Sequence, residues 1–286
     1  MQTTAPTYVI GDVHGQLRHL LKLLHDADLL SSSHSWTGGQ SSLWFIGDLV
    51  DRGHDSIAVI DLVIRLQKEA AAAGGYVGSV LGNHEMLLLA AYRFGRRSTG
   101  LSSNFITKWR QNGGQRDDLA KLTKEHLAWL AALPAMVHVD KTLLIHADST
   151  FYTRYGRSVA EVNETFTNLL QRSNALAWEE MLEEFSMRGV FSHNLAGNEF
   201  IGRFLTIFGG EHIVHGHTPI HTMSGGQAKK VTTPFTYANG RCVNVDGGIY
   251  LGGPGFLYQL PSALPVAQDE ETTSSITNLH AKPLDK

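Results

Sequence analysis

The chain has 286 residues, a net charge of −3, 15 His, 29 Gly and a single Cys. A near-neutral charge provides no positive field for nucleic acid or an anionic membrane surface, so neither is expected as a partner. Cys242 alone cannot form an intramolecular disulfide or a thiolate metal centre. No apolar run approaches the ~18 residues that span a bilayer, and no leader pattern precedes the first motif, so we expect a cytoplasmic protein.

Short β-branched runs alternate with helical periodicity along the chain. Helical spacing of apolar residues predicts helices at residues 16–30, 54–73, 85–94 and 124–133. Buried strands are predicted at residues 8–10, 43–46, 76–81, 142–145, 213–214 and 242–245. This alternation is typical of an α/β architecture in which helices cover the faces of a sheet.

The second half of the chain has a different character. Residues 159–208 are predicted to be mostly helical, and residues 232–260 are Gly-rich and strand-prone, with a turn at 252–255 between two short strands. After Pro261 the composition becomes polar, so residues 262–286 are expected to form a loosely held tail. We therefore predict a single domain over residues 1–261 that contains the helical region.

Polar residues follow five of the predicted strands. The segments are GDVHG (11–15), GDLVDRG (47–53), GNHE (82–85), HAD (146–148) and HGHT (215–218). Strand ends in an α/β sheet converge on one ligand-binding edge. Two Asp, one Asn and three His make an oxygen and nitrogen donor set that suits Mn, Fe, Co or Zn. Because two cations ~3.5–4 Å apart can activate a water for attack on phosphorus, these segments predict metal-assisted hydrolysis of a phosphate ester.

Taken together and in this order, the five segments resemble the calcineurin-like metallophosphoesterases of the phosphoprotein phosphatase (PPP) type, over about residues 8–258. The HAD form of the fourth segment is similar to that of phage and bacterial serine/threonine protein phosphatases. The resemblance implies an α/β (α+β) fold in which a central β-sandwich of two mixed sheets is flanked by helices. It also implies a dinuclear metal site at the carboxyl ends of the strands.

The resemblance implies two divalent metal ions, with Mn expected and Fe, Zn, Co or Ni as alternatives. The first ion would be held by Asp12, His14 and Asp48. The second would be held by Asp48, Asn83, His146 and His217, so that Asp48 bridges the pair. A hydroxide between the metals would then attack phosphorus directly, without a phosphoenzyme intermediate.

The resemblance also assigns catalytic and phosphate-binding roles to residues of the second and third segments. His84 would donate a proton to the leaving group, Asp51 would orient His84, and Arg52 would bind phosphate oxygens together with Asn83. The forked guanidinium of an Arg suits this contact.

Two assignments involve a choice. A second phosphate-binding Arg lies between the fourth and fifth segments of the family, and we select Arg188 because a small residue follows it in the latter part of that interval. The candidates are Arg154, Arg157, Arg172, Arg188 and Arg203. In the fifth segment the His after Gly is the family's ligand, so His217 is assigned and His215 is interpreted as a strand residue or an outer partner.

The resemblance implies a phosphomonoesterase that acts on phosphoserine and phosphothreonine, with phosphotyrosine and small aryl phosphates as further substrates. The partner would be a phosphorylated protein or a small phosphoester, and a monomer is assumed. The alternative is a hydrolase similar to the symmetrical diadenosine tetraphosphatases, which residues 80–90 and 243–248 also resemble. The intact Asp51–Arg52 pair favours the protein phosphatase, because the tetraphosphatase group tends to lack this Asp. A non-catalytic binding protein would have lost a ligand or the acid, and none is replaced.

Overall fold

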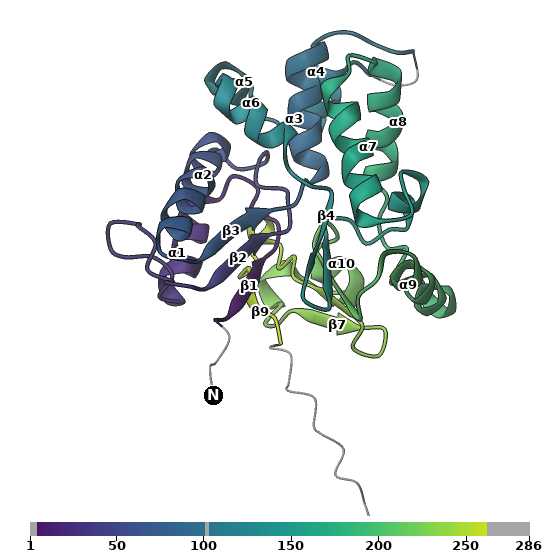
Figure 1. Ribbon diagram of the computed structural model, residues 1–286. Coiled ribbons are helices and arrows are strands. Elements are labelled where there is room, and N and C mark those ends of the chain that lie inside the picture. Colours follow the sequence, from purple (N-terminus) through teal and green to yellow (C-terminus); the bar gives the residue numbers. More distant parts are fainter. Residues whose placement is uncertain (1–4, 101–102, 262–286) are drawn as a thin grey trace, which may run out of the picture.

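The computed structural model describes residues 5–100 and 103–261, so the predicted tail at 262–286 lies outside the described residues. Two mixed sheets form its centre (Figure 1). In the first sheet, of order β3-β2-β1-β9, the first three strands of the chain are parallel and β9 is antiparallel to β1. Its strands are β1 (Thr7–Ile10), β2 (Ser42–Phe45), β3 (Tyr76–Ser79) and β9 (Leu257–Gln259).

The second sheet has the order β4-β5-β6-β8-β7. Its three central strands are parallel, and the strand at each edge is antiparallel to its neighbour. The strands are β4 (Met136–Val139), β5 (Thr142–Ile145), β6 (His212–His215), β7 (Phe235–Tyr237) and β8 (Cys242–Asn244). The parallel strands of both sheets thus have carboxyl ends from which functional loops can extend.

One apolar cluster joins the two sheets. It consists of buried side chains from strands of both and from the residues that follow them: Val9, Ile46, Val80, Leu144, Val214, Val243, Val245 and Leu260. Because burying such a side chain contributes ~1.5–3 kcal/mol relative to leaving it exposed, this cluster holds the sheets together. The predicted α/β fold with two packed mixed sheets is confirmed.

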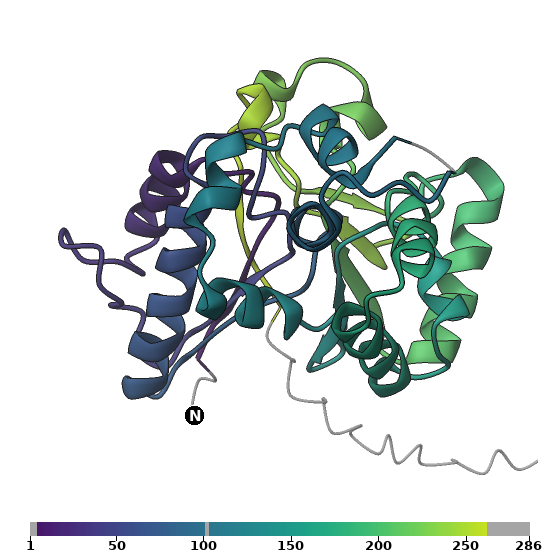
Figure 2. The ribbon, with the colours of Figure 1, turned by 90° about the horizontal axis from the view of Figure 1, so that it is seen from above.

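Helices cover the outer faces of both sheets and form a layer above their strand ends. In Figures 1 and 2, α1 (Leu17–Asp26) and α2 (Ser56–Ala72) flank the first sheet, and α9 (Asn194–Phe208) flanks the second. The layer above consists of α3 (Asn83–Phe94), α4 (Phe105–Gln111), α5 (Arg116–Lys121), α6 (Lys124–Ala131), α7 (Val159–Gln171) and α8 (Ala175–Phe185). Helix α3 is buried on all sides from residue 83 to 91, which makes it the central helix of this layer.

Three short helices complete the fold, namely η1 (Phe151–Arg154), α10 (Ile220–Ser224) and η2 (Ala228–Lys230). A fourth, η3 (Ile249–Leu251), directly precedes the predicted turn at residues 252–255, which lies between β8 and β9 as predicted. Gly248 and Gly252 adopt left-handed φ values of 70° and 81° at either end of η3. The chain leaves the turn into β9, which belongs to the other sheet from β8. No helix in the described part of the chain is long and apolar enough to cross a membrane.

Candidate metal and phosphate site

The six residues predicted as metal ligands lie together where both sheets end. They follow β1, β2, β5 and β6 directly, and Asn83 begins α3 just after β3. Each is at most 3% exposed. This set, named the ligand cluster below, consists of Asp12, His14, Asp48, Asn83, His146 and His217.

Asp48 lies at the centre of the ligand cluster. Two groups of potential ligand atoms share it, each with its atoms within 4.8 Å of one another. One group contains His146 and His217, as predicted for the second metal. The other contains His14 together with His84, the predicted acid, in place of Asp12. Asp12 is nevertheless adjacent, because its Oδ2 lies 3.9 Å from Nε2 of His14.

The orientation of two imidazoles suits metal binding. Nδ1 of His14 lies 3.0 Å from the carbonyl oxygen of Val50, and Nδ1 of His146 lies 2.7 Å from that of Ile46. Since a carbonyl can only accept, each Nδ1 carries a hydrogen, and Nε2 is the ring nitrogen left to bind a cation. Nε2 of His146 then lies 3.2 Å from Oδ1 of Asp48, within the cluster.

Several buried polar atoms of the site lack a partner. Among the residues that the structure describes, Oδ2 of Asp48, Nε2 of His217 and Oδ2 of Asp246 have no hydrogen-bond partner. A buried polar atom without a partner is costly unless a ligand satisfies it. The oxygen and nitrogen donors present therefore fit divalent cations such as Mn, Fe, Co or Zn.

The electrostatics of the site also favour cations. Burial, together with the charges of Asp246 and Asp48, raises the pKa of Asp12 well above its usual value. Burial raises the pKa of Asp246 to about 6. At Asp48 burial acts in the same direction, but the neighbouring imidazoles of His146 and His84 outweigh it and hold the pKa well below the usual range. Three buried carboxylates thus share one site, and bound cations would relieve their mutual repulsion.

Strained backbone is concentrated at these positions. Five of the ten described non-glycine residues with positive φ are His14, Asp48, Asp51, Arg52 and His217, with φ between 48° and 68°. Such conformations are costly for residues with a Cβ and tend to persist where function requires them. The turns after β1, β2 and β6 are therefore shaped by the site.

Glycine is required where the fifth segment approaches the first. A Cβ at Gly216 would lie 2.2 Å from Oδ1 of Asp12. That oxygen accepts a hydrogen bond of 3.0 Å from the backbone N–H of His217. The absence of a side chain thus lets β6 from one sheet and β1 from the other meet at the ligand cluster.

The predicted catalytic residues lie beside the ligand cluster. Nδ1 of His84 is 2.8 Å from Oδ2 of Asp51, and both side chains are buried. The other ring nitrogen, Nε2, is 3.9 Å from Oδ2 of Asp48. The half-buried Arg52 reaches this nitrogen with Nη2 at 3.3 Å, and its guanidinium carbon lies 4.1 Å from the ring centre of Tyr250.

Arg188 lies on the loop after α8 and is exposed. Its charge reaches the site: burial and the charges of His146 and Arg188 lower the pKa of His217. Two other candidates are engaged in ion pairs elsewhere, Arg154 with Glu184 and Arg203 with Glu199.

Asp148 anchors the loop that carries Arg188. Its Oδ2 accepts the N–H of Gly189 at 2.9 Å, and its backbone oxygen accepts those of Val190 and Phe191 at 3.1 and 3.3 Å. Its Oδ1 accepts the hydroxyl of Thr218, next to His217, at 2.7 Å. One residue of the HAD segment therefore joins the Arg188 loop to the turn after β6.

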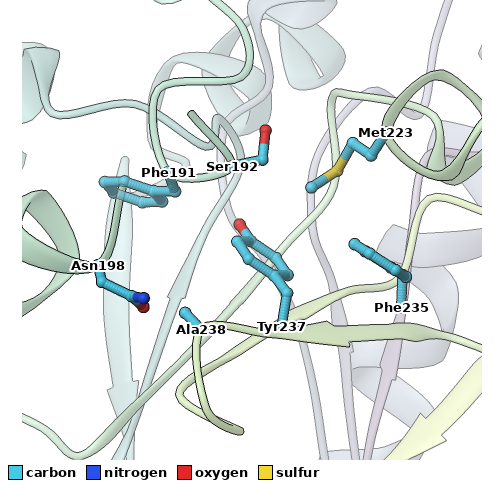
Figure 3. Close-up of a pocket in the computed structure, with 7 residues that line it drawn as sticks. All are labelled: Phe191, Ser192, Asn198, Met223, Phe235, Tyr237 and Ala238. Atoms are coloured by element: carbon cyan, nitrogen blue, oxygen red, sulfur yellow. The ribbon is translucent and has the colours of Figure 1, made fainter. Parts of the chain in front are cut away.

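His215 points away from the ligand cluster. Its Nε2 lies 2.7 Å from the hydroxyl of Tyr237. Tyr237 lines a pocket of about 240 Å³ on the second sheet, and Figure 3 shows its ring rising from β7 between Phe191 and Met223. His215 thus belongs to the strand and its neighbours, as the position before Gly216 indicated.

Several residues of the site were not identified in the sequence. Glu85 binds both flanking turns, with Oε2 accepting the N–H groups of Asp48 and Gly82 at 2.8 Å each and Oε1 that of Leu49 at 2.7 Å. Asp246 follows β8, but Val245 precedes it where most of the other strand ends have a Gly, so it lacks the signal that marked them. Tyr250, beside Arg52, has no such signal.

Two packed sheets with a His and Asp cluster at their strand ends define a metallophosphoesterase fold. Residues 5–221 match the family model "Calcineurin-like phosphoesterase", and the chain belongs to that family. The resemblance to this superfamily is therefore confirmed. The matched range ends before β7, β8 and β9, although these strands complete both sheets.

Individual relatives match over shorter ranges. Shewanella-like protein phosphatase 2 of Arabidopsis thaliana is 37% identical over 78 residues, which are 27% of this chain and 20% of that protein. The symmetrical bis(5'-nucleosyl)-tetraphosphatase of Shigella dysenteriae is 35% identical over 152 residues, 50% of this chain and 43% of that protein. The chain thus spans less than half the length of these relatives.

A solved structure shares the fold over most of the chain. The cold-active protein-tyrosine phosphatase of a psychrophilic Shewanella species has a TM-score of 0.68 to this structure at 22% identity. The superposition covers 90% of this chain and 76% of that one. At this level of identity the likeness concerns the fold.

Proposed function

We propose that this protein is a metal-dependent phosphomonoesterase that hydrolyses phosphoserine and phosphothreonine, with phosphotyrosine and small aryl phosphates as further substrates. The observation that carries the proposal is the His84–Asp51 pair beside the ligand cluster. With Nδ1 directed at Asp51, the Nε2 atom of His84 faces the cluster. A histidine oriented by a carboxylate in this way is suited to protonate the leaving alkoxide of a phosphorylated side chain.

In this proposal the ligand cluster would hold two divalent cations, and Mn is the expected metal. Bound there, they would supply Lewis acidity and lower the pKa of a water. Arg52, Asn83 and Arg188 would bind phosphate oxygens. A planar guanidinium can donate two parallel hydrogen bonds to one phosphoryl group, which orients phosphorus for attack.

Metal removal tests the proposal directly. Treatment with a chelator should abolish hydrolysis of p-nitrophenyl phosphate and of a phosphoserine peptide, and added Mn²⁺ should restore both. Divalent ions should also raise the thermal melting temperature, because only the folded state presents the buried carboxylates to a cation. Hydrolysis that persists in the fully chelated protein would contradict the proposal.

A second candidate is hydrolysis of dinucleoside polyphosphates. It is favoured by the 35% identity to the symmetrical bis(5'-nucleosyl)-tetraphosphatase, which extends over half of this chain. The His84–Asp51 hydrogen bond favours the protein phosphatase instead, because a strong general acid matters most for an alkoxide, which is a poor leaving group. Rates measured side by side on a phosphoserine peptide and on diadenosine tetraphosphate, at equal enzyme and Mn²⁺ concentrations, decide between the two.

A further inference from the structure

A tryptophan outside all five motif segments contacts the predicted catalytic pair. Trp109 lies on α4, and its side chain is fully buried. Its indole Nε1–H donates a hydrogen bond of 2.6 Å to Oδ1 of Asp51, 58 residues away in the sequence. The other oxygen of this carboxylate, Oδ2, receives His84 at 2.8 Å. Both oxygens of Asp51 are thus engaged, one by a rigid ring and one by the imidazole.

The segment that follows Trp109 is fitted to the same turn. The N–H of Arg52 donates to the carbonyl of Gly113 at 2.8 Å. Gly113 has φ of 98°, and a Cβ there would lie 2.6 Å from Cγ of Arg52. A Cβ at Gly114 would lie 2.1 Å from Cε2 of Trp109. Residues 109–114 therefore pack closely against the Asp51–Arg52 turn.

From this geometry we propose that Trp109 is a positioning residue, whose indole N–H fixes the rotation of the Asp51 carboxylate so that Oδ2 holds the His84 ring in line with the leaving group. The inference rests on the proposed function, in which His84 is the general acid. A carboxylate held only by His84 can rotate about its Cβ–Cγ bond. The indole removes that freedom because its N–H direction is set by a fully buried ring, which the backbone at Gly114 approaches closely.

The proposal predicts an effect that depends on the leaving group. Protonation by His84 matters greatly for a serine alkoxide and little for p-nitrophenolate, which leaves readily without a proton. Loss of the indole N–H should therefore reduce kcat on a phosphoserine peptide by about 10-fold, in the range found when the outer partner of a functional His is removed. It should reduce kcat on p-nitrophenyl phosphate by less than twofold and leave KM for both substrates unchanged.

The test compares Trp109→Phe with a matched control. Trp129→Phe on α6 removes an indole hydrogen bond of similar length, 2.8 Å to Oε1 of Gln67, but touches neither Asp51 nor His84. The control should keep wild-type kcat on both substrates. If Trp109→Phe lowers stability, Trp109 is replaced by benzothienylalanine, which keeps the ring shape and substitutes sulfur for the N–H.

A double-mutant cycle isolates the route through Asp51. In an Asp51→Asn background, Trp109→Phe should cause no further loss of kcat on the phosphopeptide. An equal loss on both substrates, or an additive loss in the Asp51→Asn background, would overturn the inference. If His84→Asn and Asp51→Asn themselves leave phosphopeptide hydrolysis intact, the proposed function has failed, which is a distinguishable result.

Discussion

The two arginines proposed to bind phosphate are held in different ways. Arg52 has a left-handed φ of 66°, its backbone N–H is bound to Gly113, and its guanidinium packs against Tyr250. Arg188 is exposed on a loop, which is tied down one residue later through the N–H of Gly189 to Asp148. One arginine is therefore fixed by its own backbone, whereas the other keeps side-chain freedom on an anchored loop.

The difference suggests a division of labour. A group that is held rigidly before substrate arrives stabilises charge that develops in the transition state and so affects kcat. A group that must be ordered by the substrate contributes mainly to binding and so affects KM, since part of its interaction energy is used to order the side chain. Three predictions challenge or refine this comparison, and each leaves the ligand cluster unchanged.

The largest effect should come from His84, which Arg52 contacts. His84→Asn should lower kcat on a phosphoserine peptide by ~10²–10⁴-fold, the usual contribution of a general acid, while metal content is retained. Steady-state kinetics and metal analysis of the purified variant provide the measurement. The control is His138→Asn, an exposed position on β4, which should behave as wild type. A loss below tenfold would remove His84 from the proposed role.

The two arginines themselves should differ in the parameter that changes. Arg52→Ala should reduce kcat by about 100-fold, as found when one preorganised donor to a transition-state oxyanion is removed. Arg188→Ala should raise KM about 10-fold, in line with the loss of one hydrogen bond to a charged group, and change kcat little. The comparison breaks down if both variants alter the same parameter by the same factor.

The smallest effect is expected at the anchor of the Arg188 loop. In Asp148→Asn an amide nitrogen replaces one carboxylate oxygen, so either the N–H of Gly189 or the hydroxyl of Thr218 loses its acceptor. Because the backbone hydrogen bonds of Asp148 remain, KM should rise about threefold and kcat should not change. The matched control is Asp140→Asn in the β4–β5 turn, where φ of 50° suits Asn as well as Asp. A large fall in kcat would instead group Asp148 with Arg52, as a residue that acts in the transition state.

The fold class and the grouping of the strand-end residues could be predicted because both depend on local pattern. A short buried run that ends in Gly and a polar residue marks a strand that enters a functional loop, and Asp246 after β8 lacks this mark because Val245 precedes it. The contacts of Trp109 and Tyr250 could not be predicted. α4 has an ordinary helical sequence, and only tertiary packing brings its indole to Asp51. The edge strand β4 could not be predicted either, because it is only four residues long and is defined by its pairing with β5.

The pairing of β9 with β1 has a consequence for how the protein is made. The first sheet joins the earliest strand of the chain to one that ends at residue 259. During synthesis β1 can pair with β9 only after nearly the whole described chain has emerged, whereas β2 and β3 are available much earlier. At ~5–20 residues per second this interval lasts on the order of ten seconds or more, during which an open strand edge is exposed to wrong partners. Emergence of β9 is thus the event that completes the first sheet.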